Sequence, residues 1–137
     1  MSQIDLINTD NSVSSDSLQA IVDHFADRLK INLDKRIIEI KFVNDSEMLE
    51  LNNRYRQINQ TTDVLSFPQT HNSTPQDIYG SIVISPEEAK KRHEPVDQLV
   101  LHGLLHLAGY DHEIDLNSWN WAAGAVGHDL GIFNAKI

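Results

Sequence analysis

The segment from Val96 to Ala108 constrains the fold most, because its pattern is helical and its residues are almost all apolar. Pro95 precedes it, which suits the start of a helix, and Gly109 follows it, which suits the end. A helix with almost no polar face is stable in water only when other elements cover it on all sides. We therefore expect a central buried helix at 96–108.

Three other segments predict β-strands. Residues 36–43 alternate apolar with charged side chains and contain β-branched residues, the pattern of a half-buried strand. Residues 78–84 form a second apolar run of the same kind, and 64–67 form a shorter one that stops at Pro68. Ile4, Leu6 and Ile7 begin the chain with a short apolar stretch, whereas 8–16 and 70–76 have the composition of connections.

Capping patterns predict where further helices begin. Asn44 is followed three residues later by Glu47, and Ser85 is followed by Pro86 and Glu88. An amphipathic pattern at 18–29 predicts another helix, and a weaker one begins at 115. The expected caps of the helix at 18–29 are Ser15 or Asp16, and the expected apolar side of the helix after Asn44 carries Met48, Leu51 and Tyr55.

These elements interleave, so we expect one α/β or α+β layer structure with a small sheet. A chain of 137 residues can bury a sufficient core as one domain, here residues 1–137. No stretch approaches the ~18 apolar residues of a membrane span, and the first residues lack a basic region followed by an apolar run. We therefore expect a cytoplasmic protein without membrane contact.

The net charge of −9 argues against a surface that binds nucleic acid or anionic lipid generally. A local basic groove remains compatible with it, because Arg54 and Arg56 form one basic pair and 90–92 form a Lys-Lys-Arg run. For the Lys-Lys-Arg run, a solvated helix face is the better interpretation.

Three of the seven histidines fall within eleven residues and predict a metal site. His102 and His106 are four residues apart, so their imidazoles project from one face of the helix. Gly109 can end the helix and turn the chain so that His112 reaches the same point. Without cysteine in the chain, a metal must be held by His, Asp or Glu, and three neutral imidazoles leave a fourth position open, as in catalytic zinc sites. Without such a partner, burying each imidazole would cost about 1–3 kcal/mol.

The spacing of these residues matches the metzincin peptidases, but the residue after the first histidine does not. Those peptidases use a glutamate there as general base, and this chain has Gly103, which cannot transfer a proton. Glycine inside a helix costs about 1 kcal/mol relative to alanine, so Gly103 also predicts a close approach of another group to the backbone.

At this level of detail, segment 102–112 (His-Gly-Leu-Leu-His-Leu-Ala-Gly-Tyr-Asp-His) resembles the motif of the YbeY family, the metal-dependent endoribonucleases linked to ribosomal RNA maturation. Segments 51–56 (Leu-Asn-Asn-Arg-Tyr-Arg) and 62–68 (Thr-Asp-Val-Leu-Ser-Phe-Pro) resemble a second characteristic stretch of that family. Segment 80–85 (Gly-Ser-Ile-Val-Ile-Ser) resembles its strand before the central helices.

The resemblance implies an α+β fold with a mixed four-stranded sheet and about five helices, in which the central buried helix carries the metal ligands. It implies His102, His106 and His112 as ligands of one zinc ion or another divalent transition metal such as nickel. His102 then also counts as catalytic, and Arg56 becomes a catalytic cleft residue that meets the RNA phosphate. The implied activity is single-strand-specific RNA cleavage in 16S rRNA 3′ end maturation and ribosome quality control. The implied partners are ribosomal RNA and ribosome-associated proteins, and we expect a monomer that binds no DNA.

Two departures from the family pattern stand out. Ser81 occupies the position of the family's usual aspartate, so the contacts of that carboxylate are absent. The last helix, usually rich in glutamate with a methionine, here carries Trp119, Trp121, Gly124 and Gly127.

Some residues near the motifs have two interpretations. Asp111 either orients a ligand imidazole or forms a turn, and Asp63 either caps a strand entry or holds Arg56. Tyr110, Trp119 and Trp121 can stack on unpaired bases, but core packing is the better interpretation. Of the other histidines we assign none to the metal: His24 and His93 are expected on solvent-facing sides of helices, His71 in a polar turn and His128 in the tail.

Two rival functions remain. One is a metal hydrolase of another substrate class, such as a peptidase, which Gly103 disfavours. The other is a ribosome-associated binding module whose metal is structural.

Overall fold

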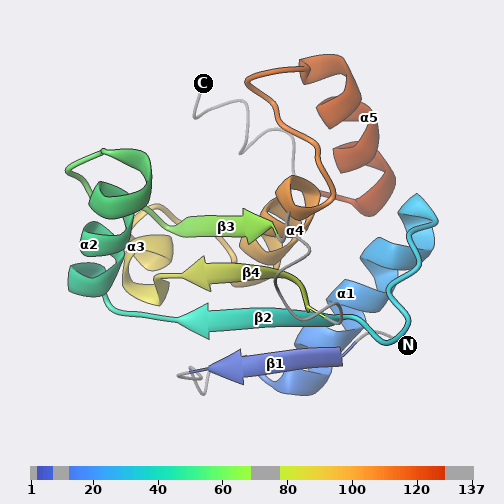
Figure 1. Cartoon of the computed structure of the whole chain (residues 1–137), viewed down its shortest axis with the longest axis horizontal. Coiled ribbons are helices and arrows are strands. Elements are labelled where there is room, and N and C mark those ends of the chain that lie inside the picture. Colours follow the sequence, from blue (N-terminus) through green and yellow to red (C-terminus); the bar gives the residue numbers. More distant parts are fainter. Residues whose placement is uncertain (1–2, 8–12, 69–77, 129–137) are drawn as a thin grey trace.

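The computed structural model of the chain describes residues 3–7, 13–68 and 78–128, with four strands and five helices in those ranges (Figure 1). The predicted turns at 70–76, with His71, lie outside the described residues. The elements in chain order are β1 Gln3–Ile7, α1 Ser15–Leu29, β2 Ile37–Phe42, α2 Asp45–Arg56, β3 Val64–Pro68, β4 Ile78–Ile84, α3 Pro86–Lys91, α4 Val96–Leu107 and α5 Leu116–Val126.

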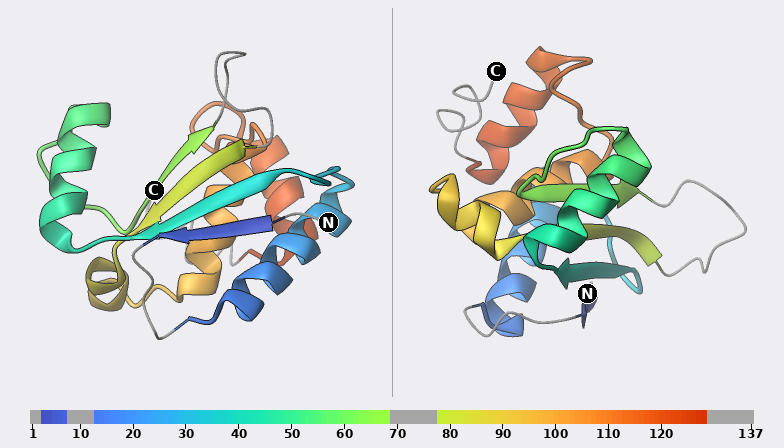
Figure 2. Two further views of the ribbon diagram at one scale, coloured as in Figure 1. Left: turned by 60° about the horizontal axis from the view of Figure 1, so that its bottom comes forward. Right: turned by 90° about the vertical axis from the view of Figure 1, so that its left-hand side faces the viewer.

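The strands form one sheet in the order β1-β2-β4-β3. β1 and β4 each pair parallel with β2, and β3 pairs antiparallel with β4 and forms one edge. The expected mixed four-stranded sheet of an α+β fold is therefore confirmed. In Figure 2, α1, α4 and α5 lie on one side of the sheet, and α2 lies beyond the end to which β2 and β4 run.

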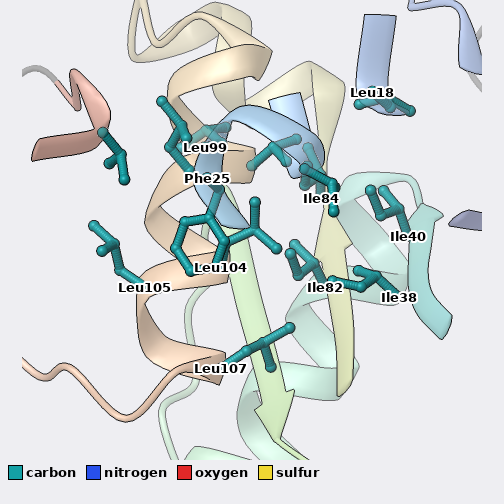
Figure 3. Packing of buried hydrophobic residues seen from close by; sticks show 14 of the residues in the cluster. Leu18, Phe25, Ile38, Ile40, Ile82, Ile84, Leu99, Leu104, Leu105 and Leu107 are labelled. Carbon is teal, nitrogen blue, oxygen red and sulfur yellow. The ribbon is translucent and has the colours of Figure 1, made fainter. Parts of the chain in front are cut away.

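Helix α4 is the centre of the main core, as its apolar sequence predicts. It contacts β3, β4, α1 and α5. Its leucines pack against isoleucines of β2 and β4 and against Phe25 of α1 (Figure 3). Because alternate residues of a strand point to opposite faces, Ile38, Ile40, Ile82 and Ile84 all lie on the face that α4 covers.

On the other sheet face, a second and smaller core cluster lies beside α2. Met48 of α2 is fully buried against Leu65 of β3 and Val83 of β4. Further along β4, Ser81 pairs with Glu39 of β2 and donates a hydrogen bond of 2.7 Å to its carboxylate. Ser81 lies on the face opposite to Ile82, so the residue that replaces the family's aspartate faces away from α4.

The predicted caps of α2 and α3 are confirmed, and Asp115, where the sequence predicts that the last helix begins, also caps its helix. Asn44, Ser85 and Asp115 each accept a hydrogen bond from the backbone N–H three residues later. At α1 the prediction of Ser15 or Asp16 is wrong, because Ser14 is extended and its side chain caps the N–H of Ser17. The helix consequently begins at Ser15, within the predicted connection.

Two other expectations are corrected. Tyr55 is 55% exposed and lies edge-on to Phe67, while the buried polar residue of α2 is Asn52, whose amide donates to the carbonyl of Gln60. His93 is exposed, as expected, but it follows α3 in a left-handed conformation with φ of 56° instead of lying in a helix.

Gly103 allows α4 to lie close to the sheet. A Cβ atom at this position would lie 2.9 Å from Cγ2 of Ile82 on β4 and within 3.0 Å of two further atoms of that side chain. The close approach predicted from a glycine inside a helix is therefore confirmed, and the approaching group is Ile82.

Alanine substitutions at two helical glycines are expected to change stability in opposite directions. Gly103→Ala should lower the free energy of unfolding, because the overpacking cost of about 1–3 kcal/mol against buried Ile82 exceeds the helix-propensity gain of about 1 kcal/mol. Gly124→Ala should raise it by up to about 1 kcal/mol, since nothing lies within 4 Å of a Cβ there. Urea unfolding of both variants measures the difference, and equal effects would contradict the close packing of α4 on β4.

Candidate metal centre

Helix α4 positions two of the three predicted ligands. His102 and His106 are half-buried, whereas the helix residues on either side of them are buried. Their ring centroids lie 4.9 Å apart, as expected for residues one helical turn apart. The one face of α4 that the core does not cover therefore carries two imidazoles.

A glycine turn brings the third histidine to the same point. After Ala108, Gly109 has φ of 98°, and its N–H donates to the carbonyl of His106. The N–H of Tyr110 donates to the carbonyl of Leu105, which completes a Schellman motif. The chain reverses there, and His112 approaches His102 and His106 with ring centroids 5.7 and 5.6 Å away.

The three imidazoles can together hold one metal ion. One nitrogen from each of His102, His106 and His112 lies within 4.8 Å of the other two. Burial is the main cause that lowers the pKa of His106, and the positive charge of Arg56 lowers it further against the opposing effect of Asp111. Burial likewise lowers the pKa of His112. Both effects favour the neutral imidazole, which is the form that binds a metal.

The lowered pKa values predict how the metal-free protein responds to acid. In the unfolded chain His106 and His112 regain their ordinary pKa, so below about pH 6.5 the unfolded state binds more protons than the folded state. The free energy of unfolding should therefore fall as pH drops from 7 towards 5 and should not depend on these groups above that range. Urea unfolding in the presence of chelator tests this, and His106→Gln should reduce the slope.

Trp119 of α5 packs against the rings of all three histidines. It is fully buried, and its ring centroid lies 5.0 Å from those of His102 and His106 and 5.1 Å from that of His112. Core packing was the expectation for this residue and is confirmed, although its packing partners are the candidate ligands. For Trp121 the same expectation is wrong, because its side chain is 65% exposed.

The histidines face a cleft of about 540 Å³ between edge strand β3 and the end of α4. Arg56, the last residue of α2, lines this cleft together with His102, His106 and His112. No carboxylate among residues 3–7, 13–68 and 78–128 forms an ion pair with Arg56, whereas the neighbouring Arg54 pairs with Glu50 at 2.7 Å. The structure thus brings together all four residues to which the sequence assigned a role.

A second arginine of the cleft was missed. Arg92 lines the cleft and pairs with Glu88 at 3.1 Å and with buried Asp63 at 3.8 Å. Lys90, Lys91 and Arg92 are all exposed, as the solvated-face interpretation predicts, but Arg92 also lines the cleft. No local pattern distinguishes Arg92 from the two lysines, because its position depends on how α3 packs beside the loop before β3.

Asp111 and Asp63, which had two interpretations from the sequence, each contact another group of the protein. The carboxylate of Asp111 accepts a hydrogen bond of 2.9 Å from the N–H of Glu113, as expected of its turn-forming alternative. Asp63 forms its ion pair with Arg92, a partner that the sequence did not suggest.

His128, predicted to lie in the tail away from the metal, is buried and contacts His102. Its Nε2 lies 3.4 Å from Nδ1 of His102, and its Nδ1 lies 2.9 Å from Oε1 of Gln98. His24, in contrast, is exposed as predicted and bonds to the carbonyl of Val126 at 3.0 Å. The sequence separation of 26 residues between His128 and His102 explains why no motif revealed their contact.

Comparisons with known proteins agree on one family. A family model described as Endoribonuclease YbeY matches residues 3–118. Endoribonuclease YbeY of Campylobacter fetus subsp. fetus is 40% identical over 75% of this chain and 78% of that protein. The protein of the same name from a Sulfurovum species is 40% identical over 81% of this chain and 84% of its own length. The one from Aliarcobacter butzleri is 48% identical over 57% and 61%.

A solution structure of a Thermotoga maritima protein also resembles this chain, with a TM-score of 0.54 and 26% identity. The superposition covers 99% of this chain and 93% of that one. Of the helices in the described ranges, none has the length and apolar character needed to cross a membrane.

Proposed function

This chain belongs to the Endoribonuclease YbeY family, and we propose that it cleaves single-stranded RNA with a bound metal in 16S rRNA 3′ end maturation and ribosome quality control. As a member of that family it hydrolyses phosphodiester bonds of RNA. The observation that carries the proposal is the convergence of three imidazoles within 4.8 Å beside Arg56 in one cleft.

The donor set fits a divalent transition metal. His102, His106 and His112 offer three neutral nitrogens, and imidazole suits zinc, nickel and similar ions. Three protein ligands leave an exchangeable position, which distinguishes a catalytic zinc site from a closed structural one. We propose one zinc ion, or another divalent ion such as nickel, held by these residues. When bound, it would lower the pKa of a coordinated water and polarise a phosphoryl oxygen.

The chain's own groups define where the phosphate binds. We propose that Arg56 binds the scissile phosphate, because its guanidinium offers parallel donors that match phosphate oxygens and it has no ion-pair partner among the described residues. As charge develops on the phosphate, these bonds strengthen. Trp119 is fully buried and packs against all three imidazoles, so water cannot reach them from the side of α5. Gly103 offers no carboxylate at the position of the peptidase base.

The charges of the cleft support a single-stranded substrate. Two arginines lie among its lining residues, and Arg92 is already paired with Asp63 and Glu88. Asp111 and Glu113 add negative charge to the same wall. Such a cleft suits one phosphate group at the metal better than the two charged backbones of a duplex.

The decisive experiment compares end-labelled RNA in single-stranded form and as a duplex of the same sequence. We expect cleavage of the single strand alone, its loss with chelator and its return with added zinc. His106→Ala, purified identically, controls for contaminating nucleases. Specific binding of ribosomes with no cleavage by zinc-loaded protein would favour the binding module instead.

The missing glutamate predicts the substrate class. At protein concentrations that degrade RNA, casein and model peptides should stay intact, because Gly103 cannot act as a general base. Gel analysis of casein digests measures this. If casein were hydrolysed by the wild type but not by His106→Ala, a peptidase activity would be favoured over RNA cleavage.

The remaining expectations follow from this activity. We propose ribosomal RNA and ribosome-associated proteins as partners, with neither DNA nor a membrane. We also propose a cytoplasmic location. We further propose that residues 1–137 act as one domain and as a monomer.

A further inference from the structure

We propose that His128 and Gln98 position His102 for metal binding by holding its imidazole in one tautomer. The inference rests on the proposed metal site and adds to it two residues outside the three-histidine motif. Gln98 lies on α4, one turn before His102, and His128 follows Gly127, the C-cap of α5. His128 is 7% exposed, so it meets His102 in a part of the site closed to solvent.

The backbone places His128 against α4. Gly127 ends α5 with φ of 79°, and the N–H of His128 donates to the carbonyl of Ala123 at 2.9 Å. A glycine turn of the same kind brings His112 to the site after α4. His128 therefore reaches His102 from α5, and its ring centroid lies 6.0 Å from that of Trp119.

The hydrogen bonds of Gln98 determine which ring nitrogen of His128, and in turn of His102, carries the proton. The Nε2 of Gln98 donates to the carbonyl of Gly127 at 3.5 Å, so the amide oxygen of Gln98 is the atom that faces His128. An amide oxygen only accepts, which requires the proton of neutral His128 on Nδ1. Nε2 of His128 is then an acceptor, and it lies 3.4 Å from Nδ1 of His102.

It follows that Nδ1 of His102 carries a proton and its Nε2 carries a lone pair. A metal-binding histidine is commonly oriented in this way by an acceptor on its other nitrogen. In most such arrangements the acceptor is a carboxylate or a backbone carbonyl, whereas here it is a second, neutral imidazole. His128 is thus a positioning residue, and His102 remains the group that contacts the metal.

The tautomer can be measured without metal. Long-range ¹H–¹⁵N correlation spectra of ¹⁵N-histidine-labelled, chelator-treated protein should show His102 protonated on Nδ1. In His128→Phe, which keeps a ring at the position, His102 should populate both tautomers. His128→Gln should restore the Nδ1 form, because the amide oxygen of glutamine can accept in place of the imidazole nitrogen.

Zinc affinity, measured by competition with a chromophoric chelator, provides the second readout. We expect binding 10–100-fold weaker in His128→Phe, near wild type in His128→Gln, and intermediate in Gln98→Met, which removes the acceptor from His128. His24→Phe is the matched control, since His24 also bonds near the end of α5 but lies outside the site. Its zinc affinity should be unchanged.

The outcomes separate the possibilities. A folded His128→Phe variant with the wild-type tautomer and zinc affinity would overturn the proposal. So would equal zinc loss in His128→Phe and His128→Gln, which would make the ring itself necessary, as for a fourth ligand. If wild-type protein bound no metal, the proposed function would fail, while the tautomer spectra would still decide whether His128 and Gln98 orient His102.

Discussion

Replacing His106 by alanine is expected to remove the metal and RNA cleavage together. His106 supplies one of three imidazole nitrogens that lie within 4.8 Å of one another. Removing a ligand should weaken binding more than the ~10–100-fold that follows from losing a residue that only orients one. Metal analysis after dialysis against a weak chelator and cleavage of single-stranded RNA measure the two losses on the same sample.

His24→Ala is the matched control, because it removes an exposed histidine that lines no part of the cleft. Near-ultraviolet circular dichroism checks that the site is still packed, since Trp119 contacts all three rings. Full metal content in a His102→Ala/His106→Ala double variant would refute the ligand assignment. Retained metal with lost cleavage in His106→Ala would instead make His106 a group that acts on the substrate.

Replacing Arg56 by alanine is expected to slow cleavage a hundredfold or more while the metal stays bound. Arg56 lines the same cleft as the three histidines, and its positive charge contributes to the lowered pKa of His106 and of His112, which fits the proposed role in binding the phosphate. Loss of one donor to a developing negative charge costs about 2.7 kcal/mol or more in the transition state. RNA affinity should change only modestly, because the interaction strengthens as the reaction proceeds.

Arg54→Ala and Arg56→Lys complete this series. Arg54 is paired with Glu50, its side chain is 58% exposed and it does not line the cleft, so its loss should leave the rate unchanged. Arg56→Lys should recover part of the rate only, since an ammonium cannot make two parallel bonds to phosphate. Metal content, RNA affinity and single-turnover rate decide the matter. If Arg56→Ala cleaved RNA at the wild-type rate, Arg56 would be a surface residue without a role in cleavage. Arg92 would then be the next candidate to bind the phosphate.

Local interactions account for what could be predicted. The predicted caps at Asn44 and Ser85 involve residues only three positions apart, so the sequence indicates them directly. The same holds for the placement of the three motif histidines, because helical spacing and the Gly109 turn act within eleven residues. Even the close approach at Gly103 was evident, although its partner Ile82 was not.

The positions of Arg92, Trp121 and His128 could not be predicted, because each depends on how separate elements pack. Trp119 and Trp121 illustrate the reason. Residues two apart on a helix are separated by a rotation of about 200° and so point to nearly opposite sides, which means that one of the two must face outward. The apolar character of both tryptophans is the same, and only the docking of α5 beside α4 decides that Trp119 is buried and Trp121 is 65% exposed.

The sequence by itself therefore determined the elements, the central helix and the grouping of His102, His106 and His112, since these depend on spacing along one short segment. Tertiary structure alone decided that Arg56 from α2 lines one cleft with these histidines and that Trp119 packs against their rings. It also decided that His128 reaches His102 over 26 residues. The free energy of these long-range contacts comes from burying whole faces of helices against the sheet, and no local pattern specifies which faces meet.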